Sequence, residues 1–218
     1  MIVERVRRIV TPPSAGEPPP PWTEDGSVLL LLASNIAALI IAQREGWSVW
    51  SLMTLYWAQG VIIGVVNVFR ILALERFSTA DVDGSAACPT PALKVQVAAI
   101  FAGFYGGLHL VYFIFVTAHT GGQLEPWFWS GVAIFALNHL WSYFYNRALD
   151  RRGTPKLGAV AFAPVLRVLP MNLIVIFGNL FAPGASLLLF GSLKIAADIG
   201  MHVFEHPEIR NAGGTTRA

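Results

Sequence analysis

Long apolar stretches separated by short polar segments constrain this chain more than any other feature of its sequence. A helix needs about 20 residues to cross about 30 Å of hydrocarbon. Stretches of nearly this length or more cover 27–43, 49–74, 95–118, 127–146, 162–182 and 185–205. Only 13% of the 218 residues are charged, whereas a typical soluble domain has about 25%. The sequence therefore predicts an all-α fold, a polytopic transmembrane helical bundle with six spans.

The ends of the chain differ in composition from these stretches. Residues 1–26 include the proline-rich run TPPSAGEPPPPW, which is typical of a disordered tail. We interpret 27–206 as a six-helix membrane domain and 207–218 as a flexible C-terminal tail. No small-residue cleavage site follows the first apolar stretch, so we expect that stretch to be retained and not removed as a secretory signal.

Lysine and arginine are distributed unevenly between the loops. Positive charges accumulate in cytoplasmic loops of membrane proteins. Here they lie in the N-terminal tail, the 75–94 loop, the 147–161 loop and the C-terminal tail, whereas the intervening loops contain only Arg44. This asymmetry predicts that both termini are cytoplasmic and that the lipid bilayer is the partner of the domain. No basic, aromatic patch indicates nucleic-acid binding, and nothing identifies a protein partner.

The last apolar stretch carries ionisable residues where lipid would disfavour them. In KIAADIGMHVFEH, three such residues are spaced four apart: Lys194, Asp198 and His202. Each costs about 2.5–3.5 kcal/mol near the centre of a membrane helix. Residues four apart advance only about 40° around a helix, so the three form one ridge. Lys194 can then neutralise Asp198, and Asp198 can hydrogen-bond to His202.

Other predicted spans carry polar residues at matching depths. Counted from the outer ends, those about nine or ten residues deep are Gln59, His109, Asn172 and Lys194. Those nearer the cytoplasmic side are Asn67, His139, Asp198 and His202. Polar groups that face lipid have no hydrogen-bonding partner. We therefore expect these side chains to converge on one polar centre inside the bundle.

Several functions are compatible with such a centre. It can be a self-paired structural set in a protein without chemistry. It can hold a divalent transition metal, with His109, His139, Asp198 and His202 as four ligands. Two imidazoles from different helices can also bind haem, which we favour less than a metal. A small transporter or proton path along the ridge is the remaining alternative. No motif of a soluble enzyme is present, so the sequence identifies no catalytic residue.

Several of these stretches together resemble a known family. The chain is similar to a prokaryotic integral-membrane family known only as domain of unknown function 6498. The similarity lies in LYWAQGVIIGVVNVFRIL (55–72), FYGGLHLVYFIFV (104–116), VLRVLPMNLIVIFG (165–178) and LKIAADIGMHVFEH (193–206). The resemblance covers the chain from about 28 to 206. It implies a multi-pass protein of the bacterial cytoplasmic (inner) membrane, and it implies no activity.

The resemblance also assigns individual residues of this chain to positions of the family pattern. On the second span, the family pattern has a tyrosine–tryptophan pair, an acidic residue, a glycine, an asparagine and a basic residue. The corresponding residues of this chain are, in the same order, Tyr56 and Trp57, Gln59, Gly64, Asn67 and Arg70. On the third span, a His-Tyr-Gly…His pattern corresponds to Phe104, Tyr105, Gly106 and His109.

The chain departs from the family pattern at positions that matter for a metal. A histidine of the fifth span corresponds to Asn172, and the Lys…Asp…His set corresponds to Lys194, Asp198 and His202. The chain thus has Gln59, Phe104 and Asn172 where the family tends to place glutamate or histidine. An amide is a weak ligand and phenylalanine is none, so the resemblance favours a polar centre more than an intact metal site.

Overall fold

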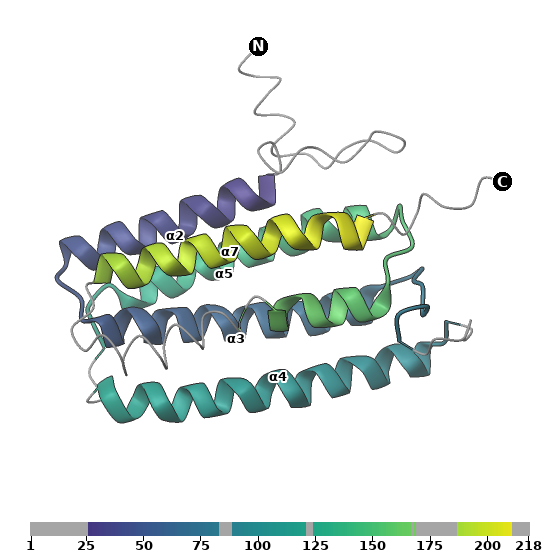
Figure 1. The fold of residues 1–218 in the computed structure, drawn as a ribbon, viewed down its shortest axis with the longest axis horizontal. Coiled ribbons are helices and arrows are strands. Elements are labelled where there is room, and N and C mark those ends of the chain that lie inside the picture. The colour runs from purple at the N-terminus through teal and green to yellow at the C-terminus, as the bar shows by residue number, and fades with distance from the viewer. Residues whose placement is uncertain (1–25, 83–88, 121–123, 167, 169–186, 211–218) are drawn as a thin grey trace, which may run out of the picture.

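The computed structural model describes residues 26–82, 89–120, 124–166, 168 and 187–210. These residues form five long helices: α2 (Gly26–Arg44), α3 (Val49–Ala73), α4 (Pro91–Thr120), α5 (Phe128–Asp150) and α7 (Leu187–Arg210). A shorter helical segment covers Leu157–Leu166. Successive helices run in opposite directions, and the start of α2 and the end of α7 lie at the same end of the bundle (Figure 1).

The fold class agrees with the prediction, because the described part of the chain is helical apart from its loops. The stretches 27–43, 49–74, 95–118, 127–146 and 185–205 each correspond to one of the five long helices. Three helices extend beyond them by more than one residue: α4 covers Pro91–Thr120, α5 continues to Asp150, and α7 continues to Arg210, past the proline where we expected the tail to begin. The terminal segments 1–25 and 211–218 lie outside the described residues.

The fifth stretch differs most from the prediction. Its helix begins at Leu157 and not at 162, so Pro164 lies inside the helix. The reason lies in the segment between α3 and α4, where both carboxylate oxygens of Asp81 accept backbone hydrogen bonds. Gly158 N donates at 3.2 Å and Ala159 N at 2.7 Å. Asp81 thereby satisfies N–H groups that the first helical turn leaves without a partner. Residues 169–182 lie outside the described residues.

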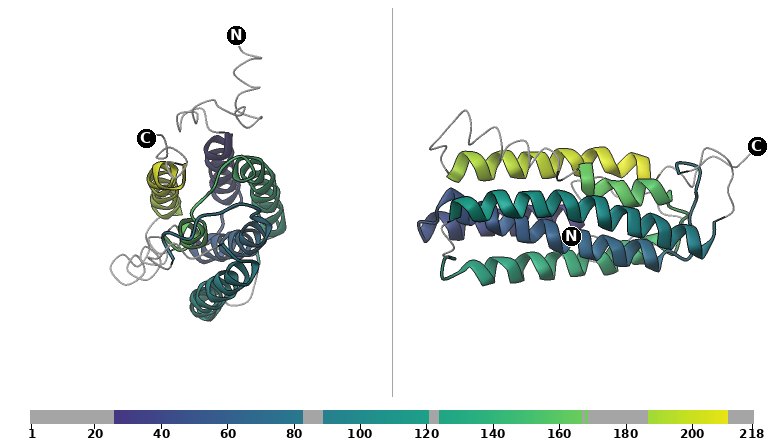
Figure 2. Two further views of the ribbon diagram at one scale, coloured as in Figure 1. Left: turned by 90° about the vertical axis from the view of Figure 1, so that its right-hand side faces the viewer. Right: turned by 90° about the horizontal axis from the view of Figure 1, so that it is seen from below.

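Helix α3 occupies the middle of the bundle. It packs against α4 on one side and against α5 and α7 on the other, while α2 packs against α5 and α7. Figure 2 shows the same arrangement along the helices, with α4 at the edge of the bundle. One apolar cluster surrounds Leu52, near the start of α3, and a second surrounds Ile71, near its end. Gln59 and Asn67, two buried polar residues of α3, lie between Leu52 and Ile71 along the helix.

Large apolar side chains also cover the outside of the helices. On α4, Ile100, Val111 and Ile114 are all more than half exposed, and Val111 reaches 68%. Two described helices, Val49–Ala73 and Pro91–Ala118, are long and apolar enough to cross a membrane. Extended apolar surface of this kind marks contact with lipid or with another protein. The number of membrane crossings stays a prediction.

Candidate functional site: a buried ionic centre

Helix α7 turns two charged residues, Lys194 and Asp198, toward the inside of the bundle. Phe190, Lys194 and Asp198 are buried, whereas Leu188 and Leu193 are exposed. This spacing of three or four residues is that of one helix face. Lys194 is only 3% exposed and Asp198 6%. Their Nζ and Oδ2 atoms are 2.6 Å apart, so the two charges form an ion pair within one helix.

The ammonium of Lys194 is surrounded by oxygen atoms from three helices. Besides Asp198, it donates to Gln59 Oε1 on α3 at 2.7 Å and to Asn35 Oδ1 on α2. A lysine ammonium has three N–H donors, and here each donor has an acceptor. The ammonium is therefore fully satisfied by protein groups, which compensates for its loss of hydration.

Asn35 links the ion pair to α2. Its amide nitrogen donates to Asp198 Oδ2 at 3.3 Å and to Leu31 O, one turn earlier, at 2.8 Å. With its carbonyl oxygen on Lys194, Asn35 contacts both members of the pair. Asn35 was not predicted as a member of the polar centre. The sequence feature that points to it is an amide in the middle of the apolar run LLLLASNIAALII.

Gln59 extends the network to α5. Its amide nitrogen lies 3.4 Å from His139 Nε2, a long hydrogen bond. Both residues are buried. Asp198, Lys194, Gln59 and His139 thus form a continuous chain of polar contacts across α7, α3 and α5. With Asn35 they make up a group that we call the ionic centre.

Two aromatic rings complete the surroundings of Lys194. Its Nζ lies 4.6 Å from the ring centroid of Tyr56 and 5.6 Å from that of Phe135. A cation at these distances from an aromatic face is stabilised electrostatically. The Tyr56 hydroxyl is buried and makes no hydrogen bond within the described part of the chain. The Tyr56 hydroxyl is therefore a buried polar group whose ring contacts Lys194 but whose oxygen has no described partner.

His109 occupies a different environment from His139. Its Nδ1 lies 3.0 Å from Tyr105 O, and its ring stacks on Tyr105 at 4.2 Å between centroids. Its Nε2 faces Gly60 so closely that a β-carbon there would overlap with it. Tyr105 in turn donates its hydroxyl hydrogen to Gly60 O at 2.9 Å. His109 is therefore held at the contact between α3 and α4.

The remaining predicted site residues are distributed as follows. Asn67 lies about two turns further along α3 than Gln59 and donates to Ala161 O at 3.4 Å. His202 belongs to α7, but its side chain lies outside the described set, as does the whole of Asn172. Of the predicted polar residues, the structure brings together Gln59, His139, Lys194 and Asp198.

The described residues contain no group of three or more histidine, cysteine, aspartate or glutamate side chains arranged to hold a metal. Asp198 is bound to Lys194 and Asn35, and His109 faces a glycine. The ligand set His109, His139, Asp198 and His202 stays a prediction, because one of its members is not described.

These features define a class of protein: an all-α bundle with an apolar exterior and a buried, internally neutralised ionic centre. Comparison with known families assigns the chain further. The model of the family of unknown function DUF6498 matches residues 19–215, and the chain belongs to that family. The resemblance seen in the sequence is therefore confirmed. No curated protein and no solved structure matches the chain.

Proposed function

We propose that the chain is a multi-pass protein of the bacterial inner membrane whose ionic centre is structural. In this proposal six spans cross the bilayer, both termini are cytoplasmic, and the ionic centre ties α2, α3, α5 and α7 together. Support for a membrane location comes from the apolar exterior and from the two helices that can cross a bilayer. The polar residues lie inside, where lipid cannot reach them.

One observation carries the structural role: the Lys194 ammonium has an acceptor for each of its three donors. A charge held this way is neutralised in place, and each acceptor comes from a side chain packed in the bundle. Helices tied through such a group keep one rotation and one register relative to each other. The ionic centre would therefore specify how the helices assemble.

Paired substitutions test this role. The variants are Lys194→Met, Asp198→Leu and the double variant, with Leu193→Met on the exposed face of α7 as the control. Removing one partner of a buried ion pair costs about 3–5 kcal/mol, whereas replacing both by apolar residues can be nearly neutral. We expect both single variants to lower the thermal unfolding midpoint in detergent and the double variant to lose less than the sum. Strictly additive losses would contradict a structural ion pair.

A second candidate function, a proton path, is favoured by the continuous chain from Asp198 through Lys194 and Gln59 to His139. The same purified protein tests it after reconstitution into liposomes with an internal pH indicator. A proton path requires a flux under an imposed potential that Asp198→Asn abolishes while the unfolding midpoint is kept. Flux equal to that of empty liposomes would exclude this candidate.

A further inference from the structure

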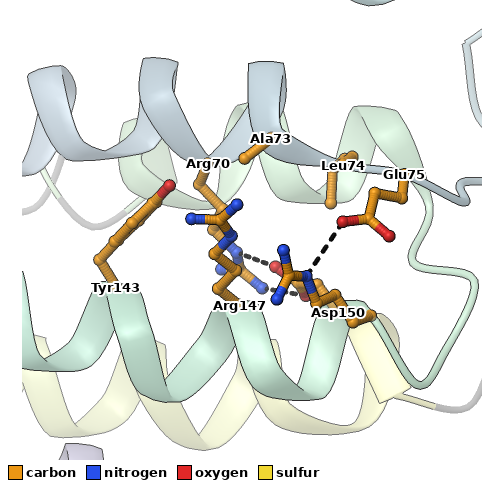
Figure 3. Close-up of a pocket in the computed structure, with 8 residues that line it drawn as sticks. Arg70, Ala73, Leu74, Glu75, Tyr143, Arg147 and Asp150 are labelled. Carbon is orange, nitrogen blue, oxygen red and sulfur yellow. Dashed lines mark hydrogen bonds and ion pairs between the residues drawn. The ribbon is translucent and has the colours of Figure 1, made fainter.

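A second group of charged side chains lies where α3 and α5 end. Here a small, partly open hollow lies between the two helices. Figure 3 shows residues of α3 and its following loop facing residues of α5 across it. The hollow is lined by Arg70, Ala73, Leu74, Glu75, Tyr143, Arg147, Asp150 and Arg151.

Two of the three arginines in this hollow are paired. Arg70 binds Asp150 through two parallel contacts, Nε to Oδ2 at 2.7 Å and Nη2 to Oδ1 at 2.8 Å. Arg151 Nε donates to Glu75 Oε1 at 3.0 Å in a more exposed pair. Both carboxylates that line the hollow therefore already have a cationic partner.

The third arginine has none. Arg147 makes no ion pair within the described residues, and its Nε is buried without a hydrogen-bond partner. Leaving a charged N–H donor buried and unsatisfied costs free energy. With three arginines against two carboxylates, the hollow also has one surplus positive charge. Tyr143, one turn earlier on α5, points its hydroxyl across the same space toward α3 (Figure 3).

We propose that this hollow binds a phosphate group, with Arg147 as its principal donor and Tyr143 as a second. A guanidinium presents several N–H groups in a planar fork that matches the oxygens of a phosphate. A phosphodiester carries one negative charge, which equals the surplus positive charge of the hollow. The group can come from an anionic lipid headgroup or from free phosphate in solution.

Only one of these two sources, the lipid headgroup, requires the protein to lie in a membrane. In the proposed topology this end of the bundle is cytoplasmic, where lipid headgroups surround the helix ends. Binding of a lipid headgroup therefore rests on the proposed membrane location. Binding of free phosphate depends only on the hollow itself, so failure of one proposal is distinguishable from failure of the other.

The experiment uses the delipidated full chain in detergent. The variant is Arg147→Gln, and Arg44→Gln, an exposed arginine at the opposite end of the bundle, is the matched control. One arm measures the unfolding midpoint against inorganic phosphate, with chloride at equal ionic strength as reference. The other measures adducts with phosphatidylglycerol or phosphatidylcholine by native mass spectrometry. We expect the unaltered chain and the control to bind, and Arg147→Gln to bind about tenfold more weakly, which corresponds to one lost charge-assisted contact.

A midpoint shift with phosphate alone identifies free phosphate as the ligand, and selective phosphatidylglycerol adducts identify the headgroup. Equal responses of Arg147→Gln and the unaltered chain in both arms would overturn the proposal. Tyr143→Phe, which keeps every charge, is measured in parallel in case Arg147→Gln does not fold. We expect it to weaken binding several-fold, and unchanged binding by this variant would also count against the site.

Discussion

Asp198 Oδ2 already receives hydrogen bonds from Lys194 and Asn35. A metal ion that used this carboxylate would have to compete with the ammonium for the same oxygen. Ligand binding through Oδ2 therefore requires Lys194 to move or to lose its proton, and both cost free energy inside a buried network. At the scale of single residues, the ion pair and a metal ion are alternatives at this one oxygen atom.

Metal content of the purified full chain decides between them. Because Asp198 Oδ2 is occupied and the described residues form no ligand cluster, we expect less than about 0.1 equivalent of tightly bound transition metal per chain, far from the full occupancy of a structural site. We also expect the visible spectrum of the same sample to show no Soret band, which bound haem would produce. A stoichiometric metal that is lost in His139→Ala and kept in His119→Ala, a histidine outside the predicted set, would support the predicted ligand set instead.

The depth of a polar residue along a predicted span could be obtained by counting, but its neighbours could not. Gln59 and His109 lie at similar predicted depth, yet Gln59 contacts Lys194 whereas His109 turns to Gly60. The difference arises from the rotation of α3 and α4, which sequence spacing does not fix. Asn35 was not predicted because a neutral amide is common in apolar helices, and only its contacts with Lys194 and Asp198 identify its role.

At the scale of helices, the length of each apolar stretch predicted where most helices lie. Packing of apolar residues stabilises the middle of a helix, whereas its exact ends vary by a residue or two. The ends depend on individual contacts. Arg70, expected only as a basic position near the inner end of its span, instead forms a two-point ion pair with Asp150 on α5. The early start at Leu157 depends on Asp81, a loop residue 76 positions earlier, and no local pattern reveals that contact.

The Asp81 contact can be tested by substitution. Loss of a side chain that caps a helix start costs about 1 kcal/mol, with a range of about 0.5–2 kcal/mol. We expect Asp81→Ala to lower the thermal unfolding midpoint and Asp81→Asn, which keeps one acceptor oxygen, to lower it less. Glu45→Ala, an exposed acid in the loop between α2 and α3, serves as the control. Equal stability of Asp81→Ala and the control would show that the cap is not important.

At the scale of the whole molecule, the outside of the described helices is apolar, unlike that of a water-soluble bundle. Leucine, isoleucine, valine and phenylalanine side chains cover it, while the ion pair of Lys194 and Asp198 and its amide partners lie buried between two apolar clusters. Water would penalise this exterior, whereas hydrocarbon accepts it. The proposed six-span topology explains the apolar exterior and places the loop that carries the single cysteine of the chain, Cys88, in the cytoplasm.

Labelling of cysteine tests this topology in intact cells. A membrane-impermeant maleimide should not label Cys88 until the cells are permeabilised, because the 75–94 loop is predicted to be cytoplasmic. The control is Glu45→Cys in a Cys88→Ser background, which should be labelled from outside because Glu45 is exposed between α2 and α3. Labelling of Cys88 in intact cells would reverse the proposed orientation.

The charges of the ionic centre are both carried by α7, while the neutral acceptors come from α2 and α3. In the proposed membrane setting, α7 is synthesised after α2 and α3 and brings its own counter-ion, so the Lys194–Asp198 pair can enter the bilayer without net charge. The amides of Asn35 and Gln59 then receive an ammonium that is already neutralised within its own helix.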